Sequence, residues 1–202
     1  MTSVHLPFPV SLSGAGVHLR EWRPEDLADL VELLDEPGIA RWTPMPSPFD
    51  LEVAVAYLAR ARQARLSGQR IQLAITVDGG APLGEVLLFG MDVGLREADL
   101  GYMVGAAHRR RGLASGALSL LAGYARSTLH LNRLVLRIDP HNTGSCAVAR
   151  RTGFRLTGEP PIVQEGPHGP SRLQTWEMVP GGGSRFDRLR NVAARRYGRL
   201  DR

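Results

Sequence analysis

One segment of this chain, from Leu100 to Ala125, has the pattern of a strand, a short loop of small residues and arginines, and a Leu/Ala-rich helix. The first turn of a helix presents unpaired backbone N–H groups and a partial positive charge, and this arrangement binds phosphate. Gly112 would let a pyrophosphate approach the backbone, with three arginines beside it. The loop lacks the Gly-Lys-Ser/Thr ending of nucleotide hydrolases and the glycine spacing of a dinucleotide fingerprint. The segment predicts a phosphate site, with a solvated Arg run before an ordinary helix as the alternative.

The order of the predicted elements indicates a mixed α+β domain. Alternation and apolar runs predict strands over residues 17–22, 71–77, 82–91, 98–104, 134–138, 154–157 and 172–179. Helical periodicity with capping signals predicts helices that begin near residues 24, 49, 111 and 143. Strands and helices in this order favour a mixed sheet with helices on its faces. Three prolines predict a loop over residues 41–48.

The positive charge of the chain is concentrated at its C-terminal end. All 25 basic residues are Arg, and residues 181–202 carry seven of them against two acidic residues, whereas residues 1–180 are balanced. The domain surface is therefore not basic, which argues against nucleic acid as a partner. Apolar residues at helical spacing after the Gly-Gly-Gly run at 181–183 predict an amphipathic helix. We expect it to dock on this domain or on a second subunit, with RNA contact as the alternative.

We therefore expect three parts: a loose N-terminal segment over residues 1–16, one domain over residues 17–179, and a Gly linker with an Arg-rich helix over residues 180–202. The single cysteine, Cys146, excludes an intrachain disulfide and a Cys-rich zinc site, so no metal is expected. No apolar run approaches the roughly 20 residues that span a bilayer, and the first ten residues lack the pattern of a signal peptide. The expectation is a soluble, cytoplasmic protein without a membrane partner.

A second segment adds a motif to the first. A buried-type strand over residues 134–138 is followed by Asn142 and Ser145, a short helix, and then Gly-Phe. Together the two blocks resemble the GCN5-related N-acetyltransferase (GNAT) superfamily. Its patterns Arg/Gln-x-x-Gly-x-Gly/Ala and Asn-x-x-Ser/Ala followed by Gly-Phe match Arg109, Gly112 and Ala114, and Asn142, Ser145, Gly153 and Phe154. The resemblance covers about residues 17–179 and is closest to the ribosomal-protein alanine acetyltransferase (RimJ/RimL-like) branch, which shares the strand ending Gly101-Tyr102.

The resemblance implies a mostly antiparallel, twisted sheet of about seven strands flanked by about four helices, with a V-shaped cleft for acetyl-CoA or another acyl-CoA. It implies that the backbone of Met103 and Val104 pairs with the pantetheine arm. The pyrophosphate would lie mostly on main-chain N–H groups of Arg109, Arg110, Arg111, Gly112, Leu113, Ala114 and Ser115. Asn142 would orient the pantetheine or the start of its helix, and a simple N-cap is the alternative.

The reaction that the resemblance implies is direct attack of an amine on the thioester, which requires alignment and proton handling. Asp99 is the first candidate base, with an exposed or ion-paired Asp as the alternative. Glu85 is the second candidate, with structural pairing as its alternative. Ser145 is the candidate proton donor to the leaving thiolate, because many relatives carry a Tyr four positions later, where this chain has Ala149.

Two loops are expected to select the acceptor, one through Trp42 and the other through Glu165 and His168. The leading interpretation is an N-acetyltransferase that acts on a primary amine, with the N-terminal amine of a protein as the acceptor that the nearest branch implies. One alternative is a small-molecule amine, antibiotics included. Another is a non-catalytic CoA-binding module that contacts a partner or RNA through the Arg-rich tail. A docked tail helix would suit a homodimer.

Overall fold

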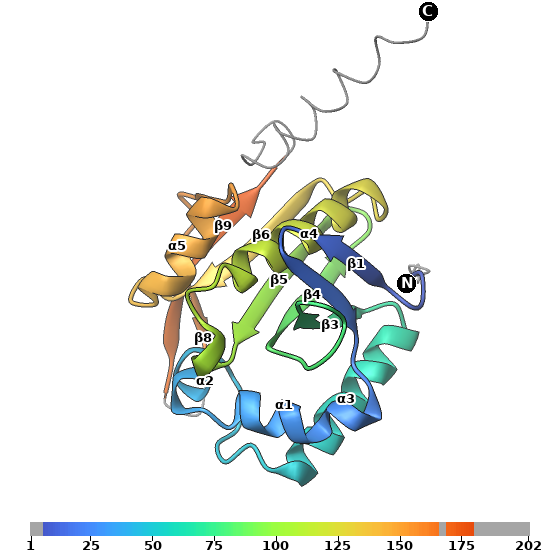
Figure 1. Cartoon of the computed structure of the whole chain (residues 1–202). Coiled ribbons are helices and arrows are strands. Elements are labelled where there is room, and N and C mark those ends of the chain that lie inside the picture. The colour runs from blue at the N-terminus through green and yellow to red at the C-terminus, as the bar shows by residue number, and fades with distance from the viewer. Residues whose placement is uncertain (1–5, 166–168, 180–202) are drawn as a thin grey trace, which may run out of the picture.

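A computed structural model describes residues 6–165 and 169–179 of the 202-residue chain. Its nine strands belong to one sheet arrangement with helices on both faces (Figure 1). The strands are β1 (Ser11–Gly14), β2 (Val17–Glu21), β3 (Arg70–Thr76), β4 (Gly84–Asp92), β5 (Glu97–Val104), β6 (Arg133–Ile138), β7 (Arg155–Leu156), β8 (Ile162–Gln164) and β9 (Ser171–Met178). The helices are α1 (Leu27–Leu34), α2 (Pro37–Trp42), α3 (Leu51–Leu66), α4 (Leu113–Ser127) and α5 (Thr143–Arg151), with short 3-10 turns η1 (Pro24–Asp26) and η2 (Ala106–His108).

The strand order is β1-β2-β3-β4-β5-β6-β9-β7, and β8 pairs with β9. All described pairs are antiparallel except β5 with β6. The chain passes from β5 through α4 to β6, because parallel neighbours require a crossover connection. The predicted mixed, mostly antiparallel sheet with flanking helices is confirmed.

Alternation along β5 separates two apolar cores. Leu100 belongs to the larger core, which the sheet shares with α4 and α5. Met103 belongs to the second core, which contains residues of α1 and α3 packed around Phe49. Successive side chains of a strand point to opposite faces, so Asp99 and Gly101 lie on the same face as Met103. Figure 1 shows the helices distributed over the two faces.

Strands β5 and β6 diverge after a short pairing. They are in register only where Glu97–Asp99 face Arg133–Val135. From residue 100 to 104, β5 remains paired with β4, whereas β6 continues with β9. The sheet therefore opens in its middle, as expected from the V-shaped cleft that the family resemblance implies.

The structure adds three elements to those predicted. Ser11–Gly14 pairs with β2 although residues 1–16 were expected to be loose, and Leu6 and Val10 are buried in the larger core. Pro37 begins α2, which reaches Trp42 and shortens the predicted loop. Strand β8 lies in the Gly/Pro-rich connection before β9. The predicted linker and Arg-rich helix over residues 180–202 lie outside the described residues.

Candidate active site

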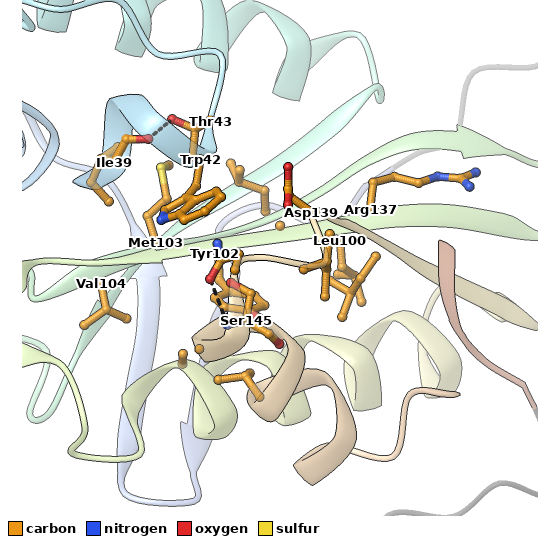
Figure 2. Close-up of a pocket in the computed structure, with 18 of the residues that line it drawn as sticks. Ile39, Trp42, Thr43, Leu100, Tyr102, Met103, Val104, Arg137, Asp139 and Ser145 are labelled. Carbon is orange, nitrogen blue, oxygen red and sulfur yellow. Dashed lines mark hydrogen bonds between the residues drawn. The ribbon is translucent and has the colours of Figure 1, made fainter. Parts of the chain in front are cut away.

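A cavity of about 990 Å³ fills the opening between β5 and β6. Its wall consists of residues 100–104 of β5, the end of β6, the loop before α4, the start of α5, and α2. In Figure 2, Trp42 and Met103 lie on one side of β5, whereas Tyr102 and Ser145 lie on the other. The volume is at the upper end of the range for small-molecule sites. The cavity brings together the two sequence blocks that the motifs single out.

The N-terminus of α4 forms one end of the cavity. Gly112 caps this helix with a φ of +81°, a left-handed conformation that favours glycine. The first N–H of the helix with an intrahelical acceptor is that of Gly116, which bonds to the Gly112 carbonyl. The N–H groups of residues 113–115 therefore have no intrahelical partner, and all three residues line the cavity. Such a helix start suits the phosphates of a nucleotide ligand.

The three arginines of this loop differ in their surroundings. The Arg109 guanidinium donates to the Val104 carbonyl at 3.0 Å and forms an ion pair with Glu36, which lies between α1 and α2. It therefore braces the loop against the end of β5. Arg109 and Arg110 line the cavity, whereas Arg111 does not. Of the loop arginines, Arg110 thus lies in the wall without a described carboxylate partner.

The free edge of β5 forms the floor of the cleft. Met103 and Val104 pair with β4 through Glu85 and Gly84, and both line the cavity. No described strand pairs with their other edge, because β6 has already diverged. An unpaired strand edge accepts an extended ligand with amide groups by strand addition. This geometry fits the predicted place of a pantetheine arm.

The start of α5 lies across the cleft. Asn142 is its N-cap, and its side-chain oxygen accepts from the Ser145 N–H at 3.1 Å, so the capping alternative is observed in a residue that also lines the cavity. The Tyr102 hydroxyl donates to the Ser145 carbonyl at 3.1 Å and ties α5 to β5. Burial raises the pKa of Tyr102 to about 12, so this hydroxyl stays protonated. Ser145 is half-buried in the wall, and Ala149 is fully buried in the core.

Asp99 lies in the cavity wall and also has an ion-pair partner. Its carboxylate is 3.5 Å from Nε of Arg137, and its side chain is 30% exposed. Burial raises the pKa of Asp99 above its usual value, although Arg137 opposes that shift. The predicted base and its ion-paired alternative therefore describe the same residue.

Glu85 is fully buried and does not line the cavity. Its carboxylate accepts hydrogen bonds from Trp22, Tyr57 and Gln72. The structural pairing expected for this residue is therefore present. Of its three partners, Tyr57 lines the cavity, so the carboxylate is separated from the cleft by one side chain.

Of the three residues predicted to contact the acceptor, one lines the cavity. Trp42 lines the cavity, and its ring is covered by the Arg41 guanidinium at 4.7 Å. Glu165 is exposed and does not line it, although the neighbouring Gln164 does. His168 lies outside the described residues.

Four further residues line the cavity that no sequence motif marks, namely Tyr57, Arg70, Phe89 and Arg137. Strand alternation could have found Phe89, because it shares the face of Glu85 in β4. No comparable signal marks Tyr57, whose helix α3 carries an ordinary mixture of apolar and charged residues.

Within residues 6–165 and 169–179, no cluster of three or more His, Cys, Asp or Glu side chains could hold a metal ion. In the same ranges, none of the helices has the length and apolar character needed to cross a membrane.

Known proteins that are similar to this chain in sequence or fold are acetyltransferases. The family model of the acetyltransferase (GNAT) domain matches residues 17–155. The N-acetyltransferase p20 of Bacillus licheniformis is 26% identical over 141 residues, which cover 69% of this chain and 79% of that protein.

Two solved structures are also similar in fold. RimJ of Mycobacterium smegmatis, solved in complex with CoA-disulfide, superposes with a TM-score of 0.76 at 23% identity, over 93% of this chain and 94% of that one. The ribosomal-protein-S5-alanine acetyltransferase from Vibrio fischeri superposes with a TM-score of 0.74 at 15% identity, over 85% and 97%. The family match extends over well over half of the sequence and contains both motif blocks, and the chain therefore belongs to the GNAT family of acyl-CoA-dependent N-acetyltransferases.

Proposed function

We propose that this enzyme transfers an acetyl group from acetyl-CoA to the N-terminal amine of a protein. The observation that carries the proposal is that one cavity is continuous from the helix N-terminus of α4 to the wall that contains Trp42 and Asp99. A donor with phosphates and a cationic acceptor can therefore occupy one space from opposite ends.

The donor half would use main-chain groups. The N–H groups of Gly112, Leu113, Ala114 and Ser115 would hold the pyrophosphate, with Arg110 adding charge. The backbone of Met103 and Val104 would hold the pantetheine along the free edge of β5. Asn142 would keep the start of α5 in place through its cap. Arg109 would act on the loop through its contacts with Val104 and Glu36.

The acceptor half would manage charge and protons. Asp99 would attract the ammonium group, because its carboxylate lies in the wall on the acceptor face of β5. The proton that this group must lose can pass to Asp99 or to Glu85 behind Tyr57. Ser145 would supply the proton that the departing thiolate takes up, because its hydroxyl lies at the first turn of α5 and Ala149 carries no hydroxyl.

A protein acceptor is supported by the similarity to RimJ and to the S5-alanine acetyltransferase. A small-molecule amine is the competing acceptor class, since the structure of the self-immunity acetyltransferase MccE, solved with acetyl-CoA and AMP, also superposes with a TM-score of 0.72 at 19% identity. We further propose that residues 17–179, together with β1 and the buried Leu6 and Val10, form the catalytic domain, and that residues 180–202 contact this domain or a second subunit.

The test is release of thiol from acetyl-CoA by the full chain with peptides that have a free N-terminal Ala or Ser. The same peptides with a blocked N-terminus, peptides with Lys as their sole amine, and small amines are the controls. We expect release only with free N-termini. Release with small amines alone would show that the acceptor is a small-molecule amine and would overturn the protein acceptor. No release with any amine would overturn the proposed function.

A further inference from the structure

We propose that Tyr57 and Glu85 form a proton relay, in which the Tyr57 hydroxyl takes a proton from the acceptor amine and passes its own proton to Glu85. The inference rests on the proposed transfer to an amine and adds to it Tyr57, a cavity residue that no motif marks, as the link to the candidate base Glu85. Tyr57 would be a catalytic residue, and Glu85 would act through it.

Three donors from three elements surround the Glu85 carboxylate. Nε1 of Trp22, just after β2, and Nε2 of Gln72, in β3, are each 2.8 Å from one of its oxygens. The Tyr57 hydroxyl of α3 is 2.6 Å from the other oxygen. Trp22 and Gln72 therefore share one oxygen, and Tyr57 has the second oxygen to itself. A proton arriving along the Tyr57 bond would meet an oxygen that has no second donor among these three.

The relay lies beside the part of β5 that forms the floor of the cleft. Glu85 is directly opposite Met103 in the ladder between β4 and β5, and both side chains share one face of the sheet. Glu85 has no exposed surface, whereas Tyr57 lines the cavity with 6% of its surface exposed. The Tyr57 ring packs edge-on against the buried ring of Phe49, with centroids 5.7 Å apart, which fixes its orientation. Tyr57 is therefore the side chain that lies between the buried carboxylate and the cavity.

Burial and the neighbouring groups bring the pKa of the Glu85 carboxyl close to neutral pH. Burial raises the pKa of Glu85 to about 7, although its three hydrogen bonds and the nearby Arg70 oppose that shift. Burial and the neighbouring Glu85 raise the pKa of Tyr57 well above its usual value, with Arg70 and Arg60 opposing. Tyr57 therefore stays protonated and serves as a conduit, while Glu85 can gain or lose a proton near neutral pH.

Asp99 is less suited to the same step. Burial raises the pKa of Asp99, but Arg137 lies 3.5 Å from its carboxylate and favours the charged, proton-free form. A carboxylate held in this way attracts an ammonium group but is a weaker proton acceptor. The two acids thus differ in environment, as groups with separate roles in one site do.

The proton count closes for this step. The ammonium form of the acceptor gives one proton to the Tyr57 oxygen, and the Tyr57 proton moves to Glu85. The free amine then forms a bond from nitrogen to the thioester carbon, and the carbon–sulfur bond breaks with its electron pair on sulfur. Ser145 gives its hydroxyl proton to the thiolate and recovers a second proton from the nitrogen, and the third proton remains on the amide. Glu85 becomes neutral and later returns its proton to solvent.

The experiment measures kcat/KM against pH for transfer to a peptide amine, in the full chain and in five variants. Wild type is expected to show a limb that rises with pH near neutrality. Tyr57→Phe and Glu85→Gln should move that limb up to the pH at which the peptide amine itself loses its proton, about 8, and should lose about 100-fold or more of kcat/KM. Trp22→Phe removes a donor to Glu85 without touching the cavity wall, so the limb should move to higher pH. Asp99→Asn should keep the limb and raise KM for the peptide.

Tyr124→Phe is the matched control, because it removes another partly buried tyrosine hydroxyl that has no hydrogen-bond partner among the described residues and does not line the cavity. It should leave the profile unchanged. Binding of acetyl-CoA with wild-type affinity shows that each variant is folded. A limb that keeps its wild-type pH in Glu85→Gln, or that moves in Asp99→Asn, would overturn the relay and leave acetyl transfer intact. An inactive wild type with every amine would instead overturn the proposed function and the relay with it.

Discussion

The donor half of the proposed site depends most directly on the backbone conformation of Gly112. Its φ of +81° places the chain so that the loop ends and α4 begins at the next residue. No atom lies within 4 Å of the position that a Cβ would take there, so a larger residue meets open space and is penalised by the backbone angle alone. The cost of such a left-handed residue is about 1–2 kcal/mol.

Gly112→Ala should therefore lower the free energy of unfolding by about 1 kcal/mol and weaken binding of acetyl-CoA, because the helix start would shift. Gly123→Ala is the matched control, since Gly123 lies inside α4 and a Cβ there also meets no atom within 4 Å. Alanine at this helical position should leave binding unchanged and raise stability by up to ~1 kcal/mol. Chemical denaturation and calorimetry check both results, and equal effects of the two substitutions would refute the role of the backbone angle.

Glu85 also makes stability depend on pH. Its pKa is about 7 in the folded chain against an ordinary value of 4.5, so between these values the folded state binds a proton that the unfolded state does not. Its contribution to stability is present at low pH and is lost as the pH rises through about 7. Wild type should thus lose up to ~3 kcal/mol relative to Glu85→Gln between pH 4.5 and 8. Denaturant unfolding at both pH values measures this difference, and parallel stability curves would contradict it.

At the scale of elements, the divergence of β5 from β6 creates the site. The two strands pair over three residues each, and beyond them β5 remains paired with β4 whereas β6 continues with β9. The opening leaves one edge of β5 free and places the N-terminus of α4 at the same end. In the proposed function, a strand edge and a helix start would thus provide backbone N–H groups to one ligand.

The loop arginines allow a test at this scale. Arg110 lines the cavity and Arg111 does not, although the two are adjacent and both exposed. Arg110→Ala should raise the Kd for acetyl-CoA about fivefold at low salt, which corresponds to about 1 kcal/mol for an exposed charge. The effect should shrink at high salt because exposed charges are screened. Arg111→Ala should change the Kd little, and an equal loss in both variants would contradict the assignment of the cavity wall.

The element sequence was largely predictable, and the exceptions have physical reasons. Strand β1 was missed because Ser11–Gly14 is short and mostly exposed, and its stability comes from pairing with β2. Helix α2 was missed because Pro37-Gly38 has the signals of a helix end, whereas Pro37 occupies the first position of a new helix. Strand β8 has three residues and is defined by its partner β9 rather than by its own sequence.

At the scale of the whole molecule, the site joins segments that are far apart in the chain. The motif residues could be found because each block is local: Arg109 to Ser115 in one loop, and Asn142 to Ser145 at one helix start. The three hydrogen-bond donors to Glu85 could not be predicted from the sequence. Trp22, Tyr57 and Gln72 lie in separate parts of the chain and meet only after the sheet and α3 have packed. Sequence patterns therefore predicted the cavity wall at the starts of α4 and α5 better than the wall around Tyr57.

The central claim is that this cleft binds acetyl-CoA for transfer to an amine, and calorimetric titration of the full chain with acetyl-CoA at moderate salt tests it most directly. The account predicts saturable binding at one site per chain, with affinity reduced by Gly112→Ala and Arg110→Ala and unchanged by Gly123→Ala and Arg111→Ala. The absence of saturable binding, or binding that none of these four substitutions alters, would contradict the account.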